Sequence, residues 1–213
     1  AGVFLIGGGA WFLSCREVGT VTIPPSRSKM GVVLKKPAVL LATVVGFLLI
    51  GAAAAVEVAV VSVFGEQGAQ AGYVLAIWAF GSIIGGLALG GLPIGPRALA
   101  TRMGVVFIGI ALAGLILDFW WISFALLIAG AGLAPALAVM FAIVSFSVKF
   151  SETAEAYGWM GSGPLVGAAL GFAIAGFAID GFGSIGGFLA AACFALLGAI
   201  VASVCVKAHP DLR

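Results

Sequence analysis

The sequence has very few charged residues and no asparagine. Only 8% of its 213 residues are charged and 63% are hydrophobic, whereas an ordinary soluble domain has about 25% charged and about 45–50% apolar residues. The formal net charge is only +2, and the ten lysines and arginines are dispersed along the chain. This composition argues against an ordinary soluble domain, and it provides no basic surface for nucleic acid.

Histidine and cysteine are also scarce. The single histidine, His209, lies in the polar tail, so the apolar segments have no imidazole for a Ser-His-Asp arrangement or a zinc site. Residues 90–95 have the glycine spacing of a phosphate-binding loop, but Pro96 and Arg97 follow in place of Lys-Ser/Thr. The three cysteines lie in or beside apolar segments, where we interpret them as small hydrophobic residues or free thiols. We therefore expect no enzyme, no metal site and no cofactor.

Long uncharged stretches predict an all-α, polytopic transmembrane bundle, because a helix needs about 20 apolar residues to cross the hydrocarbon core. We expect residues 1–14 to be the end of a helix that begins upstream, which would make the chain a fragment of a longer protein. A basic cytoplasmic linker at 15–38, a bundle at 39–206 and a cytoplasmic tail at 207–213 should follow. The six complete helices are expected at residues 39–64, 72–92, 101–119, 122–146, 157–179 and 182–206.

The basic residues all fall in alternate connecting segments. They lie in residues 15–38, 93–102, 147–156 and 207–213. The opposite connections contain Glu66, Asp118 and Asp180 and no basic residue. Because lysine and arginine are enriched in cytoplasmic loops, this pattern predicts a multi-pass protein of the plasma or inner membrane with its C-terminus in the cytoplasm.

The second and the fifth expected helix share a spacing of small residues. Gly81 and Gly85 lie four residues apart in one of them, and Gly163 and Gly167 lie four residues apart in the other. Small residues at this spacing allow the backbones of neighbouring helices to approach closely in lipid. Matching second and fifth helices indicate two three-helix units, an arrangement known from transporter halves.

Four stretches carry a similarity to a known family. They are SRSKMGVVLKKPAVLLA, EVAVVSVFGEQGAQAGYVLAIWAFGSIIGGLALG, GGLPIGPRALATRMG and SETAEAYGWMGSGPLVGAALGFAIAGFAID. In order, they resemble the central loop, the seventh and eighth helices, the repeated Gly/Asp/Arg loop motif and the eleventh helix of major facilitator superfamily transporters of the bacterial small-molecule efflux type. The similarity covers essentially the whole chain, from the end of the sixth helix through the twelfth.

The resemblance implies proton-coupled efflux of a small organic molecule by secondary active transport. It implies as partners the membrane lipids, the missing N-terminal six-helix half, the substrate and protons. No aspartate precedes Arg97 in the loop motif, so Arg97 and Arg102 remain as cations of a cytoplasmic loop interface. The alternative is a non-transporting membrane subunit or sensor whose helix bundle serves assembly.

Glu57 is the candidate coupling residue because it lies inside the apolar run GAAAAVEVAVVSVF. Phe64 ends that run seven residues later, which places the acid roughly 10 Å inside the membrane boundary. An acid at a helix centre costs about 2.5–3.5 kcal/mol, so it generally faces a bundle interior or a water-filled cavity. We expect Glu57 to bind a coupling proton or a cationic substrate group, unless it lies close enough to the surface to stay hydrated.

Four further side chains are candidates for substrate contact. They are Trp78, Ser82, Trp159 and Ser162. Their rings and hydroxyls offer stacking and hydrogen bonding to a small molecule, and the alternative is that they are core or lipid-facing positions. Pro135 is expected either to kink or break its helix near a binding site or to be tolerated there, as prolines often are in membrane helices.

Overall fold

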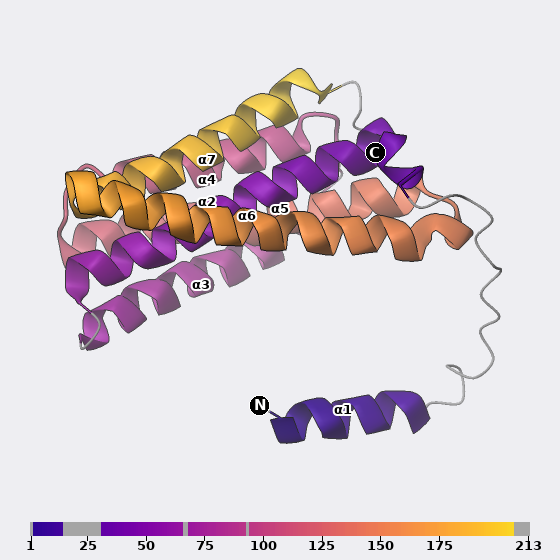
Figure 1. Cartoon of the computed structure of the whole chain (residues 1–213), viewed down its shortest axis with the longest axis horizontal. Coiled ribbons are helices and arrows are strands. Elements are labelled where there is room, and N and C mark those ends of the chain that lie inside the picture. Colours follow the sequence, from indigo (N-terminus) through magenta and orange to yellow (C-terminus); the bar gives the residue numbers. More distant parts are fainter. Residues whose placement is uncertain (1, 15–30, 66–67, 93, 207–213) are drawn as a thin grey trace.

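The computed structural model describes residues 2–14, 31–65, 68–92 and 94–206, and it is an all-α structure (Figure 1). The α-helices of these residues are α1 (Gly2–Ser14), α2 (Pro37–Phe64), α3 (Ala69–Leu89), α4 (Ala98–Ala113), α5 (Phe119–Ser147), α6 (Thr153–Phe182) and α7 (Ser184–Val204). Two short 3-10 helices, η1 (Val33–Lys35) and η2 (Phe150–Glu152), precede α2 and α6. Most of the expected basic linker, Glu66 and the tail at 207–213 lie outside the described residues.

Five of these helices are long and apolar enough to cross a membrane, namely α2, α3, α5, α6 with the preceding η2, and α7. The helix α4 has 16 apolar-rich residues and is shorter. Large apolar side chains are exposed around the bundle, with Phe177 at 83% and Leu165 at 73% of their full accessibility. Exposed apolar surface of this extent needs an apolar surrounding, and together with the helix lengths it indicates a multi-pass membrane protein.

The helix α4 differs most from its expected range of 101–119. It begins three residues earlier and ends at Ala113. The reason is the cap of the next helix: the Asp118 carboxylate accepts hydrogen bonds from the backbone N–H groups of Trp120 (2.9 Å) and Trp121 (3.2 Å). An aspartate in this position fixes the start of α5, so residues 114–118 form the connection.

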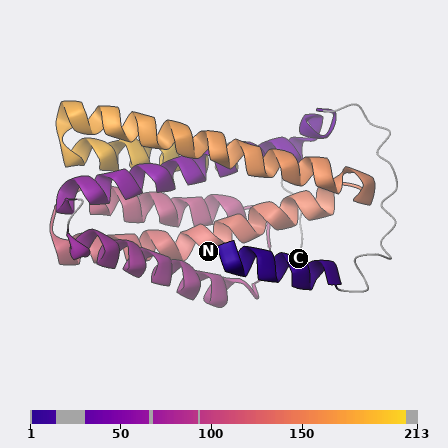
Figure 2. The same ribbon diagram turned by 60° about the horizontal axis from the view of Figure 1, so that its bottom comes forward.

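The six helices α2 to α7 form one elongated bundle (Figures 1 and 2), and their contacts divide it into two three-helix units. In the first unit (α2, α3, α4) and the second (α5, α6, α7), equivalent helices make equivalent contacts. The helix α2 packs along α6 as α5 packs along α3, and α4 packs on α5 as α7 packs on α2. This arrangement is the one that the matching glycines predicted. Three spans in each unit and equivalent contacts between the units are what an inverted repeat would also give.

Glycines bring the paired helices into contact. A Cβ atom at Gly81 or Gly85 of α3 would overlap the backbone of α5, and one at Gly167 or Gly171 of α6 would overlap the backbone of α2. Lipid is as apolar as leucine, so helices in a membrane associate mainly by close packing. The absent side chains are therefore what allows these two pairs to form.

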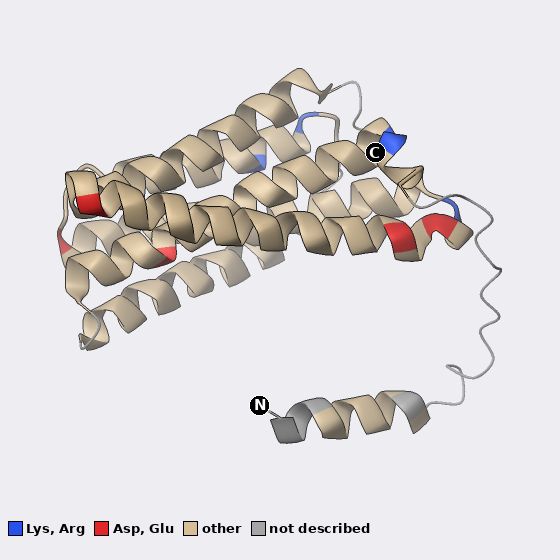
Figure 3. Ribbon diagram, viewed as in Figure 1, with Lys and Arg blue, Asp and Glu red and all other residues tan. Residues whose placement is uncertain are grey.

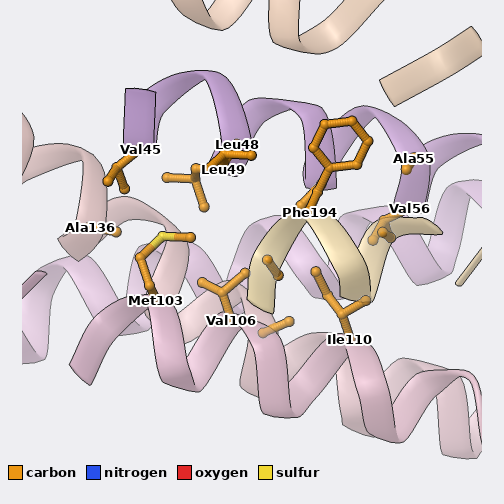
Figure 4. Packing of buried hydrophobic residues seen from close by; sticks show 14 of the residues in the cluster. Val45, Leu48, Leu49, Ala55, Val56, Met103, Val106, Ile110, Ala136 and Phe194 are labelled. Carbon is orange, nitrogen blue, oxygen red and sulfur yellow. The ribbon is translucent and has the colours of Figure 1, made fainter. Parts of the chain in front are cut away.

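The core lies behind these pairs, between α2, α4, α5 and α7 (Figure 4). Its largest fully buried side chains include Leu49, Leu99, Met103, Ile110, Ile122, Leu126 and Phe188. Side chains from the four helices meet there, as Figure 4 shows for Val45 of α2, Met103 of α4, Ala136 of α5 and Phe194 of α7. On the opposite side, α2, α3, α5 and α6 line a cavity of about 730 Å³.

The two ends of the bundle differ in charge (Figure 3). Among the described residues, lysines and arginines gather toward one end, whereas acids occur at both. At the basic end, the ammonium of Lys36 lies 2.6 Å from the carboxylate of Glu152, and the Glu155 carboxylate accepts a hydrogen bond from the Gly31 backbone N–H at 2.6 Å. These contacts attach the segment before α2 to the start of α6, and thus join the first unit to the second.

Candidate functional site

A cavity of about 730 Å³ lies between α2, α3, α5 and α6; we call it the central cavity. Its apolar walls include Ile50 of α2, Leu75 of α3, Leu133 of α5 and Phe172 of α6. Its polar lining consists of Glu57, Trp78 and Ser82. A volume of this size, apolar walls and a few convergent polar groups are typical of small-molecule sites.

Glu57 reaches the cavity because of its position on α2. The neighbouring residues Val56, Ala59 and Val60 are fully buried in the core, while Glu57 lies on the exposed side of the helix and lines the cavity. No described basic side chain pairs with it, since the one ion pair of the described residues joins Lys36 to Glu152. The carboxylate is therefore free to bind a proton or a cation that enters the cavity.

Trp78 is 8% exposed, and its indole N–H has no hydrogen-bond partner among the described residues. The ring lies against Gly130 of α5, where an added Cβ would be 3.0 Å from the ring and would overlap the Trp78 carbonyl. A buried donor without a partner costs about 1–3 kcal/mol, and such groups in native structures call for a functional explanation. Trp78 lines the central cavity, so a small turn of its ring would bring this buried N–H to an acceptor on a bound molecule.

Ser82 follows Trp78 by one turn on the same face of α3. Residues four apart on a helix lie above one another, so the indole and the hydroxyl form a short polar row along one wall. The Ser82 side chain is partly buried and lines the same cavity as Glu57. A serine hydroxyl can both donate and accept a hydrogen bond. The cavity therefore combines one acid, one donor and one group that can do either.

Trp159 and Ser162 do not line the central cavity. Trp159 is partly buried, and the exposed Ser162 hydroxyl donates to the Gly158 carbonyl within its own helix at 2.9 Å. The helix α6 instead contributes Ala168 and Phe172. Ser162 lies six residues before Ala168, which is about 9 Å along the helix axis. The structure thus brings together three of the five expected contact residues.

Arg97 and Arg102 lie apart from the central cavity. Arg97 is exposed immediately before α4. Arg102 is inside α4 with 8% of its surface exposed, and its Nη1 donates to the backbone carbonyl of Pro135 at 2.9 Å. The helix α5 continues through Pro135 without a break. Their role as cations of a loop interface stays a prediction.

Several residues of the site carry no sequence signal. Ala53 and Ala168 line the cavity, yet alanines like them occur on every helix. Gly130, which makes room for the Trp78 ring, looks in the sequence like any other glycine of a membrane helix. No protein-family model matches the chain, and a comparison with curated proteins finds no significant similarity.

Proposed function

We propose that this bundle carries out secondary active transport of a small organic molecule, as the C-terminal half of a major facilitator-type transporter. The supporting observation is the central cavity: Glu57, an acid two turns inside the end of an apolar membrane helix, lines it together with Trp78 and Ser82. Intramembrane acids generally face such cavities and mark substrate or proton pathways. The partner in this proposal is an N-terminal six-helix half that would face α2, α3, α5 and α6.

The chemistry of the cavity favours a lipophilic cation as substrate. The described lining has one acid and no basic side chain. An amine or quaternary ammonium group would pair with Glu57, and an apolar body would pack against Trp78 and Phe172. Aromatic faces also attract cations. The indole N–H and the Ser82 hydroxyl would orient an acceptor atom of the same molecule.

One carboxylate can couple substrate to protons by competition. A proton bound to Glu57 removes the charge that holds a cationic substrate, and a bound substrate excludes the proton. Binding that is mutually exclusive in this way is reciprocal by linkage. If the two halves rock around the cavity, a proton that enters from outside would release the substrate there, and the net result is efflux.

The proposed location is the plasma or inner membrane, with the basic end of the bundle in the cytoplasm. The described Lys35, Lys36, Arg97 and Lys149 all belong to connecting segments of that end. Basic residues of short loops stay on the cytoplasmic side. The C-terminus would then also be cytoplasmic, and membrane lipid would surround the apolar exterior.

Transport by the protein from its complete reading frame tests the proposal. Proteoliposomes with an imposed pH gradient should move ethidium, a fluorescent lipophilic cation, faster than empty liposomes. The variant Glu57→Gln keeps the shape of the side chain and loses its charge, so the gradient-driven rate should fall about tenfold or more, as expected when a charged hydrogen bond of about 1.5–3 kcal/mol is lost.

Asp180→Asn is the matched control, because Asp180 is an exposed acid at the end of α6 that does not line the central cavity. Its rate should equal that of the unmodified protein. An unchanged rate and pH dependence in Glu57→Gln would refute the role of Glu57. Absence of movement for ethidium and for a panel of other organic cations would favour the alternative of a non-transporting subunit or sensor.

A further inference from the structure

A second cavity, of about 480 Å³, lies between α3, α4 and α5; we call it the arginine cavity. Arg97, Thr101 and Arg102 line it together with apolar residues such as Leu89 and Val105. No aspartate or glutamate is among the described residues that line it. It lies toward the basic end of the bundle and shares no lining residue with the central cavity.

Arg102 is held in this cavity by close packing of α4 on α5. A Cβ atom at Gly132 would lie 2.7 Å from the backbone carbonyl oxygen of Arg102, so only glycine allows this approach. The approach lets the Arg102 guanidinium reach the Pro135 carbonyl. The side chain is therefore more than nine-tenths buried and fixed in place.

The positive charge of Arg102 has no acidic partner among the described residues. Its one hydrogen-bond acceptor there is the neutral carbonyl of Pro135, although a guanidinium has five N–H donors. The two described acids of the same end are engaged elsewhere, with Glu152 bound to Lys36 and Glu155 to the Gly31 backbone. A buried charge is costly unless it is paired, so an anion bound beside Arg102 would be stabilised.

We propose that the arginine cavity binds the phosphate of an anionic phospholipid between Arg97 and Arg102. Guanidinium groups bind phosphate oxygens in bidentate fashion, and basic pockets at the cytoplasmic side of membrane helices suit anionic headgroups. Thr101 donates its hydroxyl to its own helix backbone at Arg97 and Ala98, so the two arginines are the donors to the ligand.

The apolar residues that line the cavity favour a lipid over a free phosphate ion as the ligand. Leu89, Leu92 and Val105 line the cavity, and Leu92 is 52% exposed at the bundle surface. A free ion would gain nothing from apolar walls, whereas the glycerol and upper acyl carbons of a lipid would pack against them. The cavity is also open beside helices that lipid surrounds.

The test measures lipid binding to the full-length protein in detergent by native mass spectrometry. The probes are dioleoyl-phosphatidylglycerol and, with identical chains but no net charge, dioleoyl-phosphatidylcholine. We expect the phosphatidylglycerol to be retained at higher occupancy. Arg97→Gln should weaken its binding about fivefold, the effect of one basic residue near an anionic headgroup. Arg97 is exposed and has no side-chain hydrogen bond to a described residue, so this variant should fold normally.

Lys35→Gln is the matched control, because Lys35 is an exposed basic residue of the same end that does not line the cavity. Its phosphatidylglycerol binding should change less than twofold. Equal retention of the two lipids, or equal weakening by Lys35→Gln and Arg97→Gln, would overturn the proposal. A third arm uses inorganic phosphate. If it raises the melting temperature as much as phosphatidylglycerol does, and only when Arg97 is present, the site is one for a free anion and the lipid proposal fails.

Discussion

The two three-helix units pack alike but contribute different chemistry to the central cavity. The first unit provides Glu57, Trp78 and Ser82, whereas the second provides only apolar residues such as Leu133 and Phe172. Helix packing restricts the sequence of both units in the same way, because each closely packed helix pair needs glycines where its backbones meet. The cavity lining is not constrained in that way, so polar groups can be confined to one copy.

We expect the greatest loss of stability from substitutions that disturb helix packing, and the loss should be similar in the two units. Gly85→Ala in the first unit and Gly167→Ala in the second would each place a methyl group in the backbone of the facing helix. Overpacking of this kind typically costs 1–3 kcal/mol and sometimes more, so we expect about 3 kcal/mol from each, or loss of folded protein. Thermal unfolding in detergent measures the effect.

Each of these variants has a tolerated neighbour as control. A Cβ at Gly86 would lie 3.6 Å from the Ala134 Cβ, an ordinary contact, and one at Gly176 would meet nothing within 4 Å. Gly86→Ala and Gly176→Ala should therefore change the melting temperature little. A large effect in one unit and a small one in the other would break the equivalence.

The sequence alone predicted much of the fold. Apolar runs of about 20 residues located α2, α3, α5, α6 and α7. The four-residue spacing of glycines that begins at Gly81 in α3 and at Gly163 in α6 indicated the two units. The predicted end of α4 is wrong, because residues 114–117 are apolar enough to continue a helix and a single aspartate after them does not reveal that it caps α5. Hydropathy measures which segments avoid water, and it does not locate helix ends.

The site was predicted less completely. Glu57 was found because an acid is conspicuous in an apolar run. Trp159 and Ser162 were predicted to contact the substrate, but they do not line the central cavity. The polarity of a residue does not show how far along its helix it lies from a cavity. Arg102 was expected in a loop interface, and its burial depends on Gly132 of another helix. Contacts between distant segments of this kind have no signature in a single sequence.

A substitution at Trp78, one of the polar residues that the first unit contributes to the cavity, should have an effect of intermediate size. Trp78→Phe keeps the ring and removes an N–H that has no partner, so stability should not fall. Binding of a transported molecule should weaken about tenfold, or about 1.4 kcal/mol, if the N–H donates to it. Equilibrium binding to the purified protein checks this value.

Trp121→Phe is the converse case. The Trp121 indole N–H already donates to the Leu112 carbonyl at 2.7 Å, and Trp121 does not line the cavity. This variant should lose about 1 kcal/mol of stability and leave binding unchanged. The opposite pattern in the two tryptophans would show that the unpaired N–H of Trp78 has no part in binding.

The smallest effect concerns the contact that joins the units at the basic end. The Lys36 and Glu152 side chains are 33% and 16% exposed, so their pair should be worth no more than about 0.5–1 kcal/mol. A double-mutant cycle with Lys36→Gln and Glu152→Gln measures the coupling. A value near zero would mean that this ion pair does not help to hold the units together.

We expect the cavity between α2, α3, α5 and α6 to admit water and solutes within the membrane. Cysteine accessibility tests it most directly, in a variant whose three native cysteines are replaced by serine. Ser82 lines the cavity, and Ile84, two residues further on α3, does not. A membrane-impermeant methanethiosulfonate reagent should modify Ser82→Cys rapidly and Ile84→Cys slowly. Equal rates, or faster modification of Ile84→Cys, would contradict the account.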